Sequence, residues 1–256
     1  MWGAYAFGQP HNNSCARLAH TRVHGGALYA WARLGAAHDA QKINVPHRLT
    51  HETVVRTRAA PRRARAASGE AAPSLSLVVA TTPSGGIGQD GTLPWVAQGV
   101  HLPGDMSYFK RATTETRDPS KRNAVVMGRR TWEGIPERFR PLAGRVNIVL
   151  TSDEAYALPA GVLSATSLDE GLALAEDAGV ETAVIIGGAR LFEETVVHPR
   201  TRVVHLTIVG RDYPADAVLY ACFTDALARE YRLESEDART ESDVAYRICV
   251  YARKPR

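Results

Sequence analysis

The chain has 256 residues and a formal net charge of +4; 45% of its residues are hydrophobic and 23% are charged, which is ordinary for a globular protein of one or two domains. No apolar run approaches the length of a membrane span, and the first residues contain no compact hydrophobic segment with a cleavage site, which argues against a membrane or secreted protein. The three cysteines, Cys15, Cys222 and Cys249, lie too far apart for a disulfide framework or a metal site, so a reducing compartment is expected.

Residues 1–72, which we call the leader, differ in composition from the rest of the chain. They hold ten basic residues against three acidic ones, a net charge of +7, and six of the nine histidines. The stretch RTRAAPRRARAASGEAAPS at positions 56–74 is too rich in charge and proline to bury a core. We therefore expect a disordered basic extension over residues 1–72 and a folded domain over residues 73–256.

Three interpretations of the leader remain open. It is rich in arginine and poor in acid, as organelle-targeting segments are. Its basic clusters could bind phosphate, but the absence of interleaved aromatic residues argues against a nucleic-acid partner. It could also have no function. We expect a cytoplasmic protein, with a mitochondrial or other organellar location as the alternative.

The rest of the chain alternates predicted strands and helices. Apolar runs bounded by turn residues predict strands at residues 75–81, 123–127, 146–150, 182–186 and 202–209, and a closing pair at 231–236 and 244–252. Helical patterns occupy residues 104–114, 128–135, 167–179 and 189–196. Ser167 and Glu170 predict a capping box at the start of the third helix, and Gly179 its end. This alternation predicts an α/β domain with a largely parallel sheet covered on both faces.

Two of the predicted strands end in residues suited to an anionic ligand. Met127 is followed by GRRT at positions 128–131, where a helix begins; backbone N–H groups at a helix start and guanidinium forks bind phosphate oxygens. The strand at 182–186 is followed by Gly187 and Gly188, which let the backbone approach a diphosphate closely. Each pattern also occurs in plain turns and solvated helix faces. The two together favour a dinucleotide site without the GxGxxG fingerprint.

Asp105 lies between Pro103 and two apolar residues, Met106 and Phe109. An acid in the first turn after a proline suits the helix dipole, and this interpretation needs no function. The alternative is a carboxylate held beside an apolar wall to handle a proton, since burial raises the pKa of a carboxyl group. No histidine or cysteine cluster predicts a metal, and no serine elbow predicts acyl transfer.

These segments, in this order, resemble the dihydrofolate reductase family. The resemblance runs from about Leu75 to Ala252 and is strongest in GIGQDGTLPW (86–95), LPGDMSYFKRATT (102–114) and KRNAVVMGRRTWEGIPERFRPLAGRVNIVLTS (121–152). It is closest to eukaryotic members of the fungal or protist type. Because no thymidylate synthase domain follows, we expect a monofunctional member with an N-terminal extension. The resemblance implies one α/β domain with a mixed, mostly parallel eight-stranded sheet flanked by helices.

The resemblance also implies a reaction. It is the NADPH-dependent reduction of 7,8-dihydrofolate to 5,6,7,8-tetrahydrofolate, in which hydride passes to C6 of the pterin and N5 gains a proton. This reaction supplies one-carbon and thymidylate metabolism. The expected ligands are NADPH, dihydrofolate and folate-analogue inhibitors. We expect no metal, membrane or nucleic-acid partner, and we expect the protein to be a monomer.

The family's site residues fall on positions of this sequence. The catalytic group would comprise Asp105, Thr207, Trp95 and Leu93. The substrate would be contacted by Val78, Val79, Met106, Phe109, Ile135, Leu142 and Arg145. The cofactor would be contacted by Ala80, Ile87, Gly88, Gly128, Arg129, Arg130, Thr131, Thr151, Ser152, Ile186, Gly187, Gly188, Ala189, Arg190, Leu191 and Phe192.

The resemblance assigns roles to several of these residues. Asp105 would bind the pterin's ring N–H and exocyclic amine and favour protonation of N5, and Thr207 would hydrogen-bond its carboxylate. Arg145 would pair with the α-carboxylate of the glutamate tail. The Gly187–Gly188 peptide is expected to be cis, a form that is rare away from proline.

Several positions depart from the family's pattern. The segment VAQGV at positions 96–100 is an expected insertion beside the loop that closes over the cofactor. Ala189 replaces a usual glycine, Phe192 a usual tyrosine, and Asp153 a usual neutral or basic residue near the 2′-phosphate of NADPH.

Three rival functions are to be weighed against this one. A reductase of the riboflavin pathway would share the fold but needs other anchors than Asp105 and Arg145. A nucleotide-binding regulator without activity is left open by Phe192 and the insertion. A basic RNA-binding module rests on the leader alone.

Overall fold

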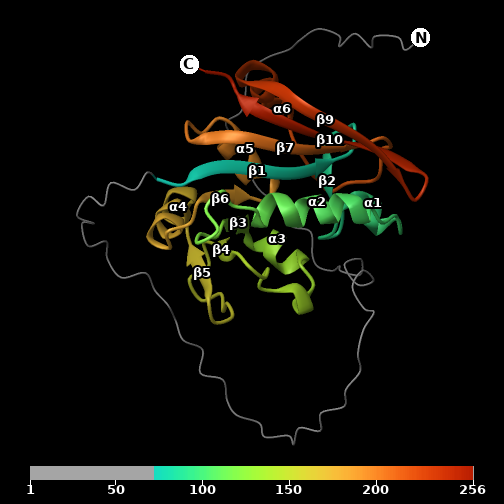
Figure 1. The fold of residues 1–256 in the computed structure, drawn as a ribbon. Helices are drawn as coiled ribbons and strands as arrows, with labels where there is room; N and C mark the ends of the chain where they lie inside the picture. Colours follow the sequence, from blue (N-terminus) through green and yellow to red (C-terminus); the bar gives the residue numbers. More distant parts are fainter. Residues whose placement is uncertain (1–71, 256) are drawn as a thin grey trace, which may run out of the picture.

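The computed structural model describes residues 72–255, and an eight-stranded sheet runs through the middle of that part of the chain (Figure 1). The strand order is β5-β4-β3-β6-β1-β7-β10-β9. The strands are β1 Ser74–Thr81, β3 Ala124–Gly128, β4 Val146–Leu150, β5 Val162–Ala165, β6 Thr182–Ile185, β7 Thr201–Val209, β9 Tyr231–Glu241 and β10 Val244–Arg253. The expected disorder of the leader lies outside the described residues. The domain boundary after residue 72 stays a prediction.

The sheet is mostly parallel, as the sequence predicted. β1 lies near its centre and pairs in parallel with β6 and β7, and β3, β4, β5 and β6 pair in parallel with their neighbours. β10 pairs antiparallel with both β7 and β9. Ser242 and Asp243, with φ angles of 51° and 57°, form the tight turn between β9 and β10, a conformation that two-residue hairpin turns require.

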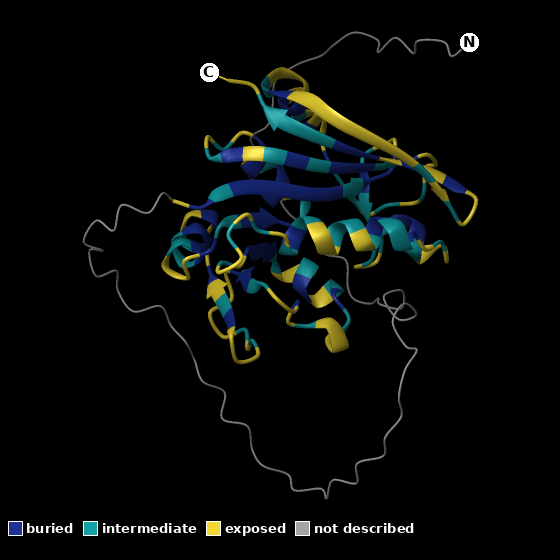
Figure 2. Ribbon diagram, viewed as in Figure 1, coloured by how far each residue is buried: buried dark blue, intermediate teal, exposed yellow. Residues whose placement is uncertain are grey.

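Helices cover both faces of the sheet. α2 (Pro103–Thr114) and α3 (Arg129–Gly134) lie on one face, while α4 (Leu168–Asp177), α5 (Ala189–Val196) and α6 (Ala221–Glu230) lie on the other (Figure 1). Side chains of β3 alternate between the two apolar clusters, with Ala124 and Val126 in one and Val125 and Met127 in the other. Figure 2 shows β1 buried along its length and β9 exposed at the sheet edge.

The predicted capping box of α4 is confirmed in its first half. The Ser167 hydroxyl accepts a hydrogen bond from the Glu170 N–H at 3.2 Å. The Glu170 carboxylate, however, accepts from the N–H and hydroxyl of Thr166, each at 2.7 Å, and not from the N–H of Ser167. The reciprocal bond is therefore moved one residue earlier than the motif predicts.

Several elements were not predicted. β5 has four residues and helix α6 follows a polar loop, so neither gives a long periodic pattern. β2 (Gly86–Gly88) and β8 (Ala217–Val218) form a separate two-stranded sheet. A short 3-10 turn, η1, spans Glu137–Phe139, and β9 runs to Glu241 where a strand end at residue 236 was expected.

The expected insertion begins in a short helix, α1 (Pro94–Ala97). The turn closes at Gly99, whose φ of 77° is the left-handed conformation that glycine adopts readily. Val96 and Val100 pack against a cluster that contains Trp95 and Tyr246. The insertion is thus anchored on the sheet through apolar contacts. No helix within residues 72–255 has the length and apolar character needed to cross a membrane.

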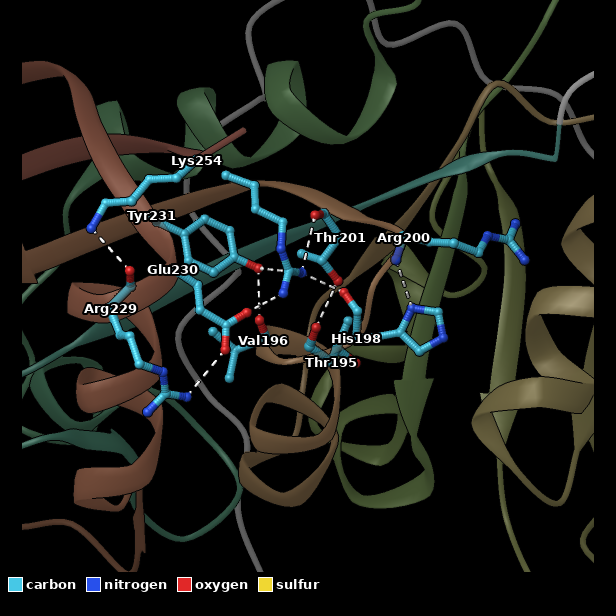
Figure 3. Close-up of polar contacts among 10 residues, drawn as sticks. Thr195, Val196, His198, Arg200, Thr201, Arg229, Glu230, Tyr231 and Lys254 are labelled. Carbon is cyan, nitrogen blue, oxygen red and sulfur yellow. Dashed lines mark hydrogen bonds and ion pairs between the residues drawn. The ribbon is translucent and has the colours of Figure 1, made fainter. Parts of the chain in front are cut away.

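A cluster of polar contacts links the end of β10 to the ends of α5 and α6 and to the starts of β7 and β9 (Figure 3). The guanidinium of Arg253 donates to the carbonyls of His198 and Thr201 and pairs with the carboxylate of Glu230. The Tyr231 hydroxyl donates to the Val196 carbonyl at 2.7 Å. These bonds join the C-terminal strand to the loop between α5 and β7 and to the end of α6.

Candidate active site

The structure brings Asp105 of α2, the residue expected to handle the proton, together with Thr207 of β7, which was expected to hydrogen-bond its carboxylate. The Thr207 hydroxyl donates to the Asp105 carboxylate at 2.7 Å, and the two residues are 6% and 4% exposed. Val204 and Leu206 of β7 belong to the cluster under α4, α5 and α6, and Ile208 packs against it, so alternation turns Thr207 towards α2. The hydrogen bond therefore fixes Asp105 against the middle of the sheet.

Burial raises the pKa of Asp105 from 3.8 to about 6. Desolvation of the carboxylate is the largest cause, and the hydrogen bond from Thr207 opposes it. The negative charge of Glu241 raises the pKa further, and the positive charge of Arg239 lowers it. Asp105 is thus a buried acid that exchanges a proton close to neutral pH, and the buried-carboxylate interpretation fits better than a surface helix cap.

A second pair joins α2 to β7 one helical turn away. The Tyr108 hydroxyl lies 2.6 Å from Nδ1 of His205, and the two rings meet edge to face. Burial lowers the pKa of His205 to about 4, so its ring is neutral at physiological pH. This pair was not predicted, and it holds the helix that bears Asp105 at a second point.

The predicted anion-binding residues converge at the carboxyl ends of the adjacent strands β3 and β6. The Gly128 N–H donates to the Gly187 carbonyl at 2.9 Å, and the Gly187–Gly188 peptide is cis, as expected. A Cβ on Gly187 would lie 2.8 Å from the hydroxyl of Thr131 in α3. Glycine is therefore required there by close packing as well as by a φ of 136°.

Both helices that begin at these glycines lack a side-chain cap. Gly128 is the N-cap of α3 and Gly188 that of α5, and glycine has no side chain that could accept a hydrogen bond from the N–H groups of the first turn. The N–H groups of a first helical turn have no partner within the helix. The two strand ends thus present backbone donors side by side, which suits phosphate oxygens.

Arg129 is held by acidic and aromatic neighbours. Its guanidinium lies 3.3 Å from the Asp153 carboxylate and 3.7 Å from that of Glu133, and it stacks over the Tyr156 ring. Asp153, which departs from the family's pattern, therefore partly neutralises this arginine. Arg130 and Ser152 are exposed, and Thr151 is buried at the end of β4.

Arg145 lies just before β4 and is half-buried. It donates to the Thr113 hydroxyl at 2.7 Å and to the Ala143 carbonyl at 3.1 Å, and burial lowers its pKa. Within residues 72–255 no ion pair involves this guanidinium. A partly desolvated cation with neutral neighbours is suited to an anionic ligand.

The remaining predicted residues divide between the two faces of the sheet. On β1, Val78 and Ala80 face α2, since Leu75, Leu77 and Val79 point into the opposite cluster. Val79, Ile87, Leu191 and Phe192 pack in or against that opposite cluster, away from Asp105.

Phe109, Ile135 and Leu142 pack under α3, and Leu93 and Trp95 pack near Ala80. Met106 is partly buried in α2, Gly88 lies in β2, Ile186 follows β6, and Ala189 and Arg190 open α5.

Two charged residues next to Asp105 were not predicted from the sequence. Glu241 and Arg239 lie at the end of β9, and Glu241 contacts the backbone of α2 across a sequence separation of 137 residues. A strand that alternates exposed charges gives no signal for such a contact. Within residues 72–255 no cluster of three or more histidine, cysteine or acidic residues could hold a metal ion.

Comparison with known proteins agrees with this geometry. A family model described as dihydrofolate reductase matches residues 74–253. The dihydrofolate reductase of Aedes albopictus is 35% identical over 188 residues, which cover 71% of this chain and 98% of that protein. A putative bifunctional dihydrofolate reductase-thymidylate synthase of Oryza sativa subsp. japonica is 43% identical over 140 residues, which cover 52% of this chain but 27% of the rice protein.

Solved structures give the same result. The dihydrofolate reductase of Schistosoma mansoni aligns with a TM-score of 0.60 at 32% identity, covering 72% of this chain and 100% of that one. The enzyme of Enterococcus faecalis, complexed with NADP(H) and RAB-propyl, aligns with a TM-score of 0.58 at 29% identity, covering 71% of this chain and 97% of that one. The chain belongs to the dihydrofolate reductase family.

Proposed function

We propose that this chain reduces 7,8-dihydrofolate to 5,6,7,8-tetrahydrofolate with NADPH. The observation that carries the proposal is the buried carboxyl group of Asp105, fixed by Thr207 and titrating near neutral pH. The membership in the dihydrofolate reductase family supports the same reaction. When ionised, such a carboxyl group can accept two hydrogen bonds from a flat heterocycle and favour protonation of that heterocycle.

Asp105 is proposed to bind the ring N–H and the exocyclic amine of the pterin and to favour protonation of N5. Thr207 limits the carboxylate to one orientation through its 2.7 Å hydrogen bond. Val78 and Ala80, on the face of β1 that looks towards α2, would supply the apolar surroundings of the pterin. Met106, Phe109, Ile135 and Leu142 would contact the pterin and the aminobenzoyl group.

The residues at the ends of β3 and β6 fit NADPH. The uncapped starts of α3 and α5 offer backbone donors for its diphosphate, and the side-chain-free surface of Gly128, Gly187 and Gly188 lets the cofactor approach. When bound, NADPH supplies the hydride. Thr131, Thr151, Ser152 and Arg130 are proposed to surround its phosphates and ribose, with Arg129 sharing its charge between Asp153 and the 2′-phosphate.

The segment from Ile87 to Trp95 is proposed to close over the ligands. Closure excludes water from the reacting groups. Trp95 is buried beside Tyr246 and Leu102, which anchors the end of this segment on the sheet. A monomeric, metal-free enzyme in the cytoplasm remains our prediction.

Turnover by the full chain tests the proposal directly. NADPH oxidation is followed with and without dihydrofolate, and binding of NADPH and folate is measured in parallel. Dihydrofolate-dependent oxidation is expected. A folded chain that binds both ligands without turnover would instead be the inactive nucleotide-binding protein, and a chain that binds no folate would contradict the assignment of Asp105.

Arg145 is expected to recognise the glutamate tail of the substrate. Replacing Arg145 by glutamine should raise KM for dihydrofolate by about tenfold to a hundredfold, the range expected for losing a hydrogen-bonded charge pair. The KM of Arg145→Lys for dihydrofolate should lie between those of the wild type and Arg145→Gln, because lysine keeps the charge but loses the planar fork of arginine. The control substrate is dihydropteroate, which lacks the glutamate; its KM should not change. An equal loss with both substrates would show that Arg145 acts on the fold and not on the tail.

A further inference from the structure

The first turn of α2, which bears Asp105, is capped from a distant part of the chain. Its N-cap residue, Leu102, provides no side-chain hydrogen bond. The two carboxylate oxygens of Glu241 accept from the Gly104 N–H at 3.1 Å and 2.9 Å instead. The Ser242 hydroxyl donates to the His101 carbonyl at 2.9 Å. The turn between β9 and β10 is therefore fastened to the start of α2 at two points.

The fit at this contact depends on the absence of a side chain at residue 104. A Cβ on Gly104 would collide with the Glu241 carboxylate, would lie 2.6 Å from the Tyr246 hydroxyl and would lie 3.1 Å from the Arg239 guanidinium. Gly104 has no positive φ, so packing against the hairpin, and not backbone conformation, explains the glycine. The hairpin thus sits directly on the residue before Asp105.

The polar and charged groups that face Asp105 come from three elements. Thr207 donates a hydrogen bond from β7, Tyr108 lies on α2 itself, and β9 brings the negative Glu241 and the positive Arg239. Arg239 divides its guanidinium between two partners: its Nε and Nη2 bond to Asp237 at 2.9 Å and 2.6 Å, and its Nη1 donates to the Gly104 carbonyl at 3.4 Å. The Glu241 carboxylate, in contrast, makes both of its contacts with the Gly104 N–H at the helix start.

We propose that Glu241 is a positioning residue for Asp105: it caps α2 and presents its negative charge to the acid, so that the orientation and protonation of Asp105 depend on the β9–β10 hairpin. The inference rests on the proposed function, because it assigns Asp105 the central role. Glu241 favours the protonated acid through repulsion between like charges, which is consistent with its contribution to the raised pKa of Asp105.

The test compares two variants of Glu241 in the full chain. Glu241→Gln keeps the size and one acceptor for Gly104 but removes the charge. The pH at which kcat/KM falls should move down by about half a unit to one unit, as expected for removing a charge near a partly buried group. Glu241→Ala also loses the cap, and KM for dihydrofolate should rise by about threefold to tenfold, while Kd for NADPH stays unchanged.

Glu236→Gln is the matched control. Glu236 lies on the same strand and pairs with Arg247 at 3.2 Å, so this variant removes the same charge away from Asp105. Its pH profile should equal that of the wild type. The proposal is overturned if the pH profile of kcat/KM for Glu241→Gln equals those of the wild type and Glu236→Gln. It is also overturned if Glu241→Gln, Glu241→Ala and Glu236→Gln all shift this profile by the same amount.

A readout without turnover separates this inference from the proposed function. The titration of Asp105 is followed by NMR of its carboxyl carbon, assigned by comparison with Asp105→Asn. If the pKa of Asp105 is lower in Glu241→Gln but not in Glu236→Gln, the inference is supported. This result would hold even if the chain proved inactive, in which case only the proposed function would fail. An unchanged titration in a folded Glu241→Gln variant, checked by thermal unfolding, rejects the inference whatever the activity.

Discussion

Replacing Asp105 by asparagine is expected to lower kcat/KM for dihydrofolate by about a hundredfold to ten-thousandfold, the usual contribution of a positioned acid or base. Asparagine keeps the size and an acceptor for the Thr207 hydroxyl, so the site's geometry should survive. NADPH binding should be retained, because the glycine-rich strand ends do not involve Asp105. Steady-state kinetics and NADPH titration with the full chain measure both effects.

The same variant is expected to be more stable than the wild type above about pH 6. The pKa of Asp105 is raised from 3.8 to about 6 by folding, so the folded chain holds this proton more tightly than the unfolded chain. Stability therefore falls as pH rises between these values, and the cost reaches about 3 kcal/mol when the buried group is fully ionised. The neutral amide of the Asp105→Asn variant avoids this cost, so the gain should be present at about pH 8 and absent below about pH 3.

Asp118 provides a control of opposite sign. This exposed acid accepts hydrogen bonds from the hydroxyl and N–H of Ser120, which lower its pKa. Its stabilising contribution is present at neutral pH and is lost as pH falls through its folded pKa. Asp118→Asn should therefore slightly lower stability at neutral pH and leave kcat/KM unchanged. Denaturant unfolding across pH distinguishes the two cases; a loss of stability in Asp105→Asn at about pH 8 would contradict the buried-acid interpretation.

Replacing Arg253 by alanine is expected to destabilise the chain by about 3 to 5 kcal/mol, as for breaking other buried ion pairs. Its side chain is 8% exposed and bonds two carbonyls and the Glu230 carboxylate in the cluster of Figure 3. Alanine would leave the His198 and Thr201 carbonyls without this donor, and the partly buried Glu230 carboxylate with its Arg229 ion pair alone. The midpoint and slope of denaturant unfolding give the change in stability.

Arg247 of the same strand is the matched control for Arg253. Its side chain is 51% exposed and pairs with Glu236, so Arg247→Ala should change stability by about 0.5 kcal/mol or less. The kcat of folded Arg253→Ala should equal that of the wild type, since this residue lies at the opposite end of β10 from the turn that contacts α2. A small change in stability would mean that water replaces the guanidinium in this cluster.

Local patterns identified most of the strands and helices that surround the site. Apolar runs of five to eight residues located β1, β3, β4 and β7, because a strand buried on both faces is predominantly apolar. Four-residue β5 and helix α6 were missed, since a short run carries too little periodicity to stand out. The apolar patterns predicted seven strands, and the expectation of an eighth came from the resemblance to the dihydrofolate reductase family.

The sequence by itself determined the residue types and their order: an acid after a proline at Asp105, glycines at the ends of β3 and β6, and a parallel sheet that brings these ends together. Only the tertiary structure decided that Thr207 fixes Asp105, that burial raises its pKa, and that Glu241 caps its helix from 137 residues away. Desolvation of a side chain, and its hydrogen bonds to distant segments, depend on which residues pack around it in the folded chain. The local spacing of residues in the sequence does not encode this packing.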